Sequence, residues 1–280
     1  MNKSMTNDSS IESTEFPQSK FIQTKEHLRF EEFAQACKKY RYIGLCYGKP
    51  GIGKSFSANH YARWDTFRNY KLIDELDAEM IQNIRQCNAI LYTAPITNTP
   101  KRIEEKLSLQ LLKFGNALAK TQGISDPKSL IRDVGYNCPL VIIDESDCLS
   151  FKSLEQLRHL YDKYNFGLIL IGMPGFEKRL SRYAQLYSRI GFAHEFQPLS
   201  EDEMEFLFEH HWQNLGLTLD KKQFSDVEAI KTIARITNGN FRLLQRIFAQ
   251  IQRIKGLNNM TKITKEVVLA ARNCLVIGQN

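Results

Sequence analysis

The chain has 280 residues, of which 42% are hydrophobic and 25% charged, so it can bury a core and is not a disordered polymer. The formal net charge of +7 favours a polyanionic partner without identifying one. The six cysteines form no Cys-x-x-Cys pair, so we do not expect a zinc site, and no apolar run resembles a signal peptide or is long enough to span a bilayer. We therefore expect a cytoplasmic protein with reduced thiols and no membrane partner.

The first quarter of the chain predicts a tail, a helix, a strand and a second helix. Residues 1–20 are polar and rich in Ser, Thr and Asn, which is typical of a flexible tail. Apolar residues three and four positions apart predict a helix over residues 24–40. Residues 42–47 form an apolar run that predicts a buried strand, and residues 56–64 predict a helix.

A glycine-rich segment joins that strand to that helix and fits the phosphate-binding pattern G-x-x-x-x-G-K-[ST]. Glycines let backbone N–H groups curl around a polyphosphate, and the following helix adds the positive end of its dipole. We expect Lys54 to reach the β- and γ-phosphates of ATP and Ser55 to bind Mg²⁺. The alternative, a chance glycine-rich turn, does not account for the strand and helix on either side. The predicted nucleotide-binding residues are Gly48, Pro50, Gly51, Ile52, Gly53, Lys54, Ser55 and Phe56.

Short apolar strands alternate with helices over the next hundred residues. This alternation predicts an α/β fold, in which a parallel sheet carries helices on both faces. The predicted strands are 89–93, 139–145 and 167–172, and the predicted helices are 101–118, 127–136 and 151–164.

Two acids end the second of these strands, in the order Ile142-Ile143-Asp144-Glu145. The carboxyl end of a parallel strand is where ligands gather in such sheets, so Asp144 is a candidate Mg²⁺ ligand and Glu145 a candidate base for the attacking water. Two exposed acids at a strand end are the alternative. The chain has no N-K-x-D motif, which argues against a small GTPase.

The pattern of predicted elements changes after Pro198, because all of those that follow are helices. Ser200 and Glu203 form a capping box at the start of the first of them. We expect a tail at 1–20, an α/β core at 21–199 and a small helical domain at 200–280. The predicted helices of that last domain are 200–215, 225–237, 241–255 and 264–274.

The glycine-rich loop, the strand ending in Asp144 and Glu145, and the helical tail carrying Gly239-Asn240-Phe241-Arg242 together resemble AAA+ ATPases. Residues 24–62 and 140–172 are similar, more narrowly, to the transposition regulators TnsC, TniB and MuB. The resemblance implies a P-loop αβα sandwich with a C-terminal helical lid, and ATP hydrolysis with ATP and Mg²⁺ bound.

The resemblance also implies roles for two arginines. Arg242 matches the sensor-2 arginine that touches the nucleotide from the lid, although a surface arginine on an amphipathic helix is the alternative. Arg189 lies where the family places an arginine finger supplied to the neighbouring subunit, with Arg179 and Arg182 as competitors. The family has a polar residue after the strand 167–172, whereas this chain has Met173, which favours a slow assembly switch over a fast motor.

In the transposition regulators, a ring or helical filament follows duplex DNA through loops after the second strand and its helix. The matching residues here suit phosphate contacts without sequence readout, although a solvated loop and helix face is the alternative. The predicted DNA-contacting residues are Asn98, Thr99, Lys101, Arg102, Lys120 and Thr121.

We therefore predict an ATP-dependent, DNA-binding regulator of transposition that forms homo-oligomers on duplex DNA. Its expected partners are a transposase and a target-selection protein. The alternative is a helicase-loader-like or secretion-associated ATPase acting on a protein. A nucleotide-sensing defence module is less favoured, because the chain lacks a long effector domain or repeat array.

Overall fold

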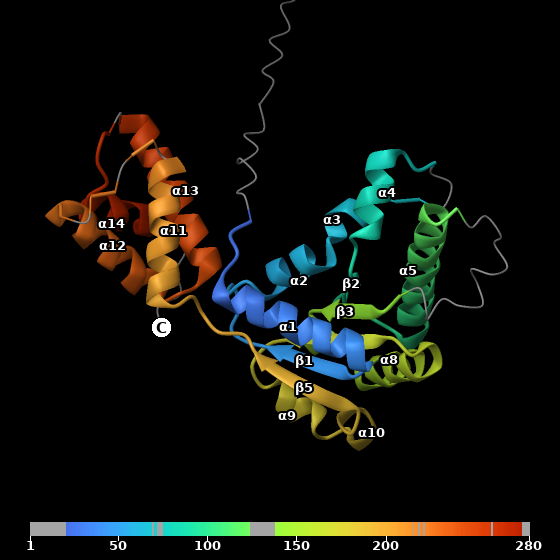
Figure 1. Cartoon of the computed structure of the whole chain (residues 1–280). Helices are drawn as coiled ribbons and strands as arrows, with labels where there is room; N and C mark the ends of the chain where they lie inside the picture. The colour runs from blue at the N-terminus through green and yellow to red at the C-terminus, as the bar shows by residue number, and fades with distance from the viewer. Residues whose placement is uncertain are drawn as a thin grey trace, which may run out of the picture.

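The computed structural model describes residues 21–68, 70–71, 75–123, 138–214, 216–217, 219–220, 222–258 and 260–275. These residues form an α/β unit and a helical unit that lies beside it (Figure 1). The predicted tail at 1–20 and the predicted helix at 127–136 lie outside the described residues.

A five-stranded sheet is the centre of the α/β unit. The strand order is β2-β3-β4-β1-β5, and every neighbouring pair is parallel, as the alternating pattern predicts. The strands are β1 Ile43–Tyr47, β2 Ile90–Thr93, β3 Leu140–Asp144, β4 Gly167–Gly172 and β5 Ile190–Glu195. The edge strand β5 was not predicted, because its residues alternate between half-buried and exposed instead of forming an apolar run.

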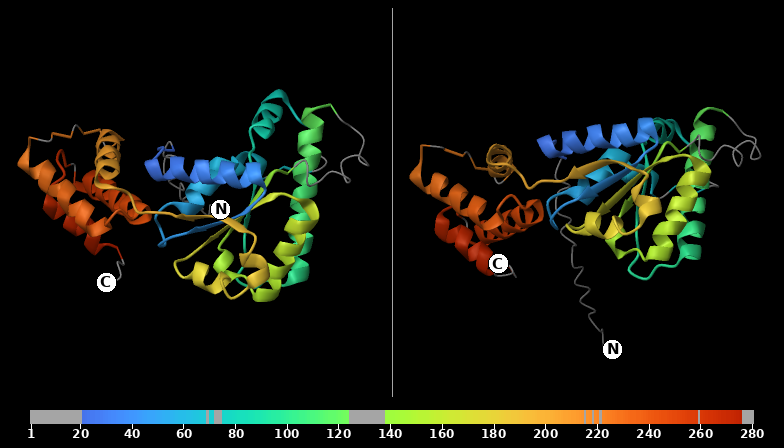
Figure 2. Two further views of the ribbon diagram at one scale, coloured as in Figure 1. Left: turned by 60° about the horizontal axis from the view of Figure 1, so that its bottom comes forward. Right: turned by 90° about the horizontal axis from the view of Figure 1, so that it is seen from below.

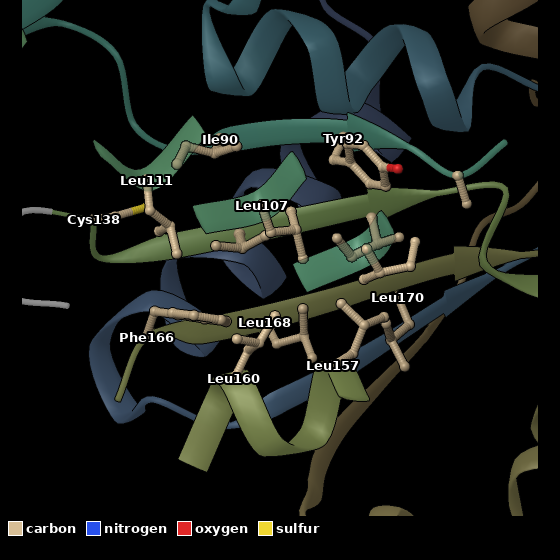
Figure 3. Close-up of a cluster of buried hydrophobic side chains, with 14 of the residues drawn as sticks. Ile90, Tyr92, Leu107, Leu111, Cys138, Leu157, Leu160, Phe166, Leu168 and Leu170 are labelled. Carbon is tan, nitrogen blue, oxygen red and sulfur yellow. The ribbon is translucent and has the colours of Figure 1, made fainter. Parts of the chain in front are cut away.

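Helices cover both faces of the sheet, so the central strands are apolar on both sides. On one face Leu168 and Leu170 of β4 pack in a cluster with α5 (Pro100–Thr121) and α8 (Phe151–Tyr164) (Figure 3). On the other face Ile169 and Ile171 of the same strand pack with α1 (Lys25–Tyr40) and α2 (Lys54–Ala62). Residues that alternate along one strand therefore separate two cores.

Several short elements were not predicted from the sequence, because each is too short for helical periodicity to appear. They are α3 Trp64–Phe67, α4 Ala78–Arg85, η1 Ser146–Cys148, α9 Phe176–Leu180 and α10 Ala184–Tyr187.

The C-terminal helices form a third core around Trp212, Phe208 and Phe248. Figure 2 shows this helical unit to one side of the sheet, joined to it through the segment after β5. The predicted capping box is present: the Glu203 N–H donates to Ser200 Oγ at 3.3 Å and the Ser200 N–H donates to Glu203 Oε2 at 2.9 Å. The helices are α11 Glu201–Asn214, α12 Phe224–Thr237, α13 Phe241–Asn258 and α14 Lys265–Asn273.

Among the described residues, the helices are all too short or too polar to cross a lipid bilayer.

The close approach of α1 to β1 depends on Gly44. A Cβ atom there would overlap Cys37 Sγ and lie 2.6 Å from Phe33 Cζ. We expect Gly44→Ala to lower the free energy of unfolding by about 1–3 kcal/mol through overpacking, measured by urea denaturation. Gly256→Ala is the matched control, because nothing lies within 4 Å of a Cβ at that position of α13. Equal stability of Gly44→Ala and wild type would contradict this packing.

Candidate functional site

The loop between β1 and α2 has the backbone that the phosphate-binding pattern predicts. Gly51 (φ 78°) and Gly53 (φ 113°) are in the left-handed region, where a side chain would be strained. Gly48 is constrained differently, because a Cβ there would lie 2.5 Å from the carbonyl oxygen of Phe196. The three glycines of the loop therefore shape it for two separate reasons.

Lys54, the first residue of α2, is buried inside this loop. Its Nζ donates to the carbonyl oxygens of Gly48 at 2.6 Å and Lys49 at 2.8 Å. Burial lowers the pKa of Lys54 from its ordinary value, whereas the nearby Asp144 and Glu145 carboxylates act in the opposite direction. The cation is thus held at the centre of the loop, where a phosphate group would lie.

Asp144 and Glu145 end β3 at the same edge of the sheet. Asp144 is buried, and its Oδ1 accepts from the Glu145 N–H at 2.9 Å. Glu145 has φ 55°, an uncommon conformation for a residue with a side chain. Burial raises the pKa of the Glu145 carboxyl, and Asp144 and Asp147 raise it further, against the effect of Lys54 and Arg242. A carboxylate with a raised pKa is suited to accept a proton near neutral pH.

The end of β4 lies between the loop and the two acids, because β4 separates β1 from β3 in the sheet. Met173 follows β4 there and lines the cavity described below, so the position expected to be polar presents a thioether. Asp147 lines the same cavity. Its Oδ1 is buried without a hydrogen-bond partner in the described part of the chain and would lie 3.2 Å from a Cβ on Gly172.

Sequence reasoning assigned no role to Asp147. The sequence could have pointed to it, because Asp147 is the third acid in the four residues from Asp144 to Asp147 at the end of β3.

The start of α13 rests directly on the glycine-rich loop. Asn240 Nδ2 donates to the Pro50 carbonyl at 2.9 Å, and the Arg242 N–H donates to the Gly51 carbonyl at 2.9 Å. The same Asn240 caps its own helix, because its Oδ1 accepts from the Leu243 N–H at 3.1 Å. The sequence singled out this segment through Arg242 and missed the role of Asn240.

A cavity of about 440 Å³ opens where the loop, the ends of β3 and β4, and α13 meet. This volume is in the range typical of small-molecule sites. The structure therefore brings together the predicted Lys54, Ser55, Asp144, Glu145 and Arg242. The lining residues are Pro50, Gly51, Gly53, Lys54, Ser55, Phe56, Asn59, Asp144, Glu145, Asp147, Ile171, Gly172, Met173, Phe241, Arg242 and Gln245.

Aromatic rings border one side of this cavity. The Phe56 ring lies 5.2 Å from that of Phe21 and is stacked with that of Phe241 at 5.8 Å, measured between ring centroids. These rings come from α2, from the segment before α1 and from α13. Of the three rings, those of Phe56 and Phe241 line the cavity, so a flat apolar group entering it would contact them.

The donor set in the cavity fits a magnesium nucleotide. Ser55 and Asp144 both line the cavity, and hydroxyl and carboxylate oxygens are the hard donors that Mg²⁺ prefers. The buried Lys54 ammonium and the loop backbone supply the positive potential that phosphates require.

Arg189 lies away from this cavity in the same subunit. It precedes β5 and its carbonyl accepts from the N–H of Ile43, the first residue of β1, roughly 16 Å along the strand from the loop. Its guanidinium forms a two-pronged ion pair with Asp162 of α8, with N–O distances of 2.9 and 3.0 Å.

The competitors of Arg189 are placed differently. Arg179 in α9 donates to the carbonyl oxygens of Asp147 and Leu149, so it braces the segment after β3, and Arg182 is exposed.

The predicted DNA-contacting residues divide between the two ends of α5. Lys101 and Lys120 are about 28 Å apart along the helix, so they do not form one patch. Thr99 caps the N-terminus of α5, where Lys101 and Arg102 are exposed. Asn98 is fully engaged: its amide donates to Cys148 O at 3.0 Å and its Oδ1 accepts from the Ser150 N–H at 3.2 Å.

The other end of α5 does not present the expected hydroxyl. Thr121 is buried, and its Oγ1 donates to the Leu118 carbonyl at 2.6 Å, so it does not reach a phosphate without loss of the last helical turn. The Lys120 ammonium lies over the Tyr70 ring, 5.8 Å from its centroid.

Sequence comparison finds three matches that bear on this site. A family described as "AAA domain" matches residues 36–180. A Staphylococcus aureus protein described as a potential ATP-binding protein is 46% identical over 263 residues, covering 92% of this chain and 97% of that protein. DNA transposition protein B of the Mu-like prophage FluMu of Haemophilus influenzae is 24% identical over 242 residues, covering 82% of this chain and 71% of that protein.

Solved structures share the fold at low sequence identity. The Holliday junction branch migration motor RuvB of Thermotoga maritima matches with a TM-score of 0.56 at 16% identity, over 92% of this chain and 71% of that one. Domain III of the replication initiation protein DnaA from the same organism matches with a TM-score of 0.54 at 15% identity, over 92% and 95%. Aeropyrum pernix Orc1, solved with DNA, matches with a TM-score of 0.52 at 14% identity, over 89% and 64%.

Proposed function

The chain belongs to the AAA domain family of P-loop ATPases, and from this premise we propose that it is an ATP-dependent, DNA-binding regulator of DNA transposition. In this proposal it assembles as an oligomer on duplex DNA and recruits or activates a transposase. The observation that carries the nucleotide part is the single cavity shared by Lys54, Glu145 and Arg242. The transposition part is supported by the similarity to transposition protein B over 82% of the chain.

Nucleotide binding follows from the cavity wall. The β- and γ-phosphates lie on the loop N–H groups and Lys54, and the base packs against the rings of Phe56 and Phe241. Ser55 and Asp144 would hold Mg²⁺. When bound, Mg²⁺ neutralises charge on the β- and γ-phosphate oxygens.

Hydrolysis is an in-line attack of water on the γ-phosphorus, with cleavage of the bond to the β–γ bridging oxygen. Glu145 takes the proton from the water, and its raised pKa suits that task. Arg242 reaches the phosphates from the lid, so hydrolysis and lid position depend on one another.

Asp147 is proposed to orient the attacking water in place of Met173. Its unpartnered Oδ1 lies beside the end of β4, where a polar residue after the strand would otherwise act. Arg179 holds the backbone of Asp147 in place, because its guanidinium donates to the Asp147 carbonyl oxygen at 2.5 Å.

The proposed base has a direct test. We expect Glu145→Gln to bind ATP as wild type but to lower kcat by about 10²–10⁴-fold, because proton transfer is lost, in a coupled ATPase assay. The ATP-bound assembly should then persist. Glu105→Gln, an exposed carboxylate on α5, is the control and should keep wild-type turnover. Wild-type turnover in Glu145→Gln would place the base elsewhere.

The proposed water-orienting residue has a different signature. We expect Asp147→Ala to lower kcat by about 10–100-fold with an unchanged ATP Kd, because a misplaced water slows attack without affecting phosphate binding. Adding Met173→Asn to that variant should restore turnover by supplying a polar group at the end of β4. A change in ATP Kd without rescue by Met173→Asn would indicate a structural role instead.

In the proposed assembly, Arg189 of one subunit lies beside the γ-phosphate bound by its neighbour. Arg189 is at the opposite end of the strands from the loop of its own chain, so it serves a neighbour's nucleotide and not its own. The ion pair with Asp162 holds the guanidinium in one orientation at the surface before assembly.

DNA contact is proposed at the N-terminal end of α5. Thr99, Lys101 and Arg102 lie at the sheet edge that carries the cavity, whereas Lys120 and Thr121 lie at the far end. Asn98 joins this region to the segment that follows Glu145, through its bonds to Cys148 and Ser150. A shift of that segment on nucleotide binding is therefore passed to the DNA-contacting loop.

The function is tested by fluorescence anisotropy with a random-sequence duplex, with and without a non-hydrolysed ATP analogue, over a salt series. We expect analogue-dependent binding, accompanied by oligomers in electron microscopy, that weakens steeply with salt. Lys54→Ala should lose the analogue dependence. The double variant Lys101→Ala/Arg102→Ala should reduce the slope of log affinity against log salt by about 2, whereas Lys106→Ala, exposed on the same helix, should not reproduce this loss.

The alternative function gives the opposite result in the same assay. A protein that acts on a protein partner, as a helicase loader or a secretion ATPase does, would show no DNA binding with the analogue and would co-purify tightly with that partner.

A further inference from the structure

A cluster of metal-ligating side chains lies outside the cavity, between α1 and α2. His27 and Glu31 are one turn apart on α1, and His60 faces them from α2. One nitrogen of each histidine and one oxygen of Glu31 all lie within 4.8 Å of one another. Three side chains from two helices thus converge on a space the size of a single ion.

His27 is the unexplained member of the cluster. The residue is 1% exposed, yet neither ring nitrogen has a hydrogen-bond partner within the described residues. Its Nε2 lies 3.3 Å from Glu31 Oε1, a close ion-pair contact without hydrogen-bond alignment. A buried polar group without a partner is costly, so a metal ion that accepts the lone pair of one ring nitrogen would remove part of that cost.

The arrangement of the three side chains suits coordination. A carboxylate oxygen of Glu31 lies beside both imidazoles, within 4.8 Å of one nitrogen of each. The Phe21 ring is stacked on the face of His60, with centroids 3.4 Å apart, which leaves the edge of the imidazole for a ligand.

We propose that His27, Glu31 and His60 form a binding site for Zn²⁺. Two imidazole nitrogens and one carboxylate oxygen are a known zinc donor set, with water in the fourth position. The absence of Cys-x-x-Cys pairs in the sequence argues only against cysteine-based sites. Glu31 is partly exposed and His60 exposed, which gives the ion a path from solvent.

The site would connect α1 to the helix that begins with Lys54 and Ser55. His60 is five residues beyond Ser55 on α2, and Phe21 touches both His60 and Phe56, which lines the cavity. Zinc would therefore fix the back of the helix that carries the phosphate-binding residues. It takes no part in hydrolysis and is independent of the proposed function.

Zinc binding is tested on the full chain after metal removal with a chelator, with Mg²⁺ and ADP saturating so that the cavity lined by Glu145 and Asp147 is occupied. We expect one equivalent of Zn²⁺ to bind and, at a hundredfold excess over Kd, to raise Tm by roughly 5–10 °C. Co²⁺ should give the visible spectrum of a histidine–carboxylate site.

The variants separate this site from adventitious binding. His60→Ala and Glu31→Gln should each lower zinc affinity by more than about tenfold and abolish the Co²⁺ spectrum. His159→Ala removes an exposed histidine on α8 and should bind as wild type. Both cluster positions reach solvent, so folding is checked by circular dichroism. Unchanged zinc affinity in His60→Ala, or no zinc binding by wild type, would overturn the proposal.

Discussion

The structure depends on the contact between the phosphate loop and the first turn of α13. The Asn240 amide donates to the Pro50 carbonyl, and the Arg242 N–H donates to the next carbonyl, that of Gly51. Asn240 and Pro50 are 190 residues apart in the chain. These two bonds bring Arg242 to the cavity that Lys54 also lines. Without them the glycine-rich loop and the helical unit would not share one cavity.

The sheet order explains why so few residues define the site. Because β4 lies between β1 and β3, the ends of three neighbouring strands present the loop, Met173 and the acids in a row. Each strand is apolar on both faces, so register is fixed by two cores rather than one. The position of Asp144, the last residue of β3, and of Glu145, which follows it, is therefore set by the sheet backbone.

Much of the fold and the site was predictable from the sequence, because the relevant signals are local. The loop, the strand that ends in Asp144 and the helices α8 and α13 all follow from spacing and hydrophobicity within short windows. Part of what the sequence did not show depends on partners far along the chain, since Asn240 acts through Pro50. Thr121 was missed for a local reason, because its hydroxyl donates to the Leu118 carbonyl of its own helix. The strand β5 has no apolar run, since it lies at the sheet edge.

The ion pair between Arg189 and Asp162 has a consequence for how subunits meet. A lone subunit already satisfies this guanidinium with a carboxylate of its own chain, so a neighbour must offer a stronger anion to draw it away. A triphosphate carries more charge than a diphosphate and is the stronger competitor. In the proposed assembly the pair would therefore act as a threshold: association would depend on the nucleotide state, and dilute or ADP-loaded subunits would stay apart.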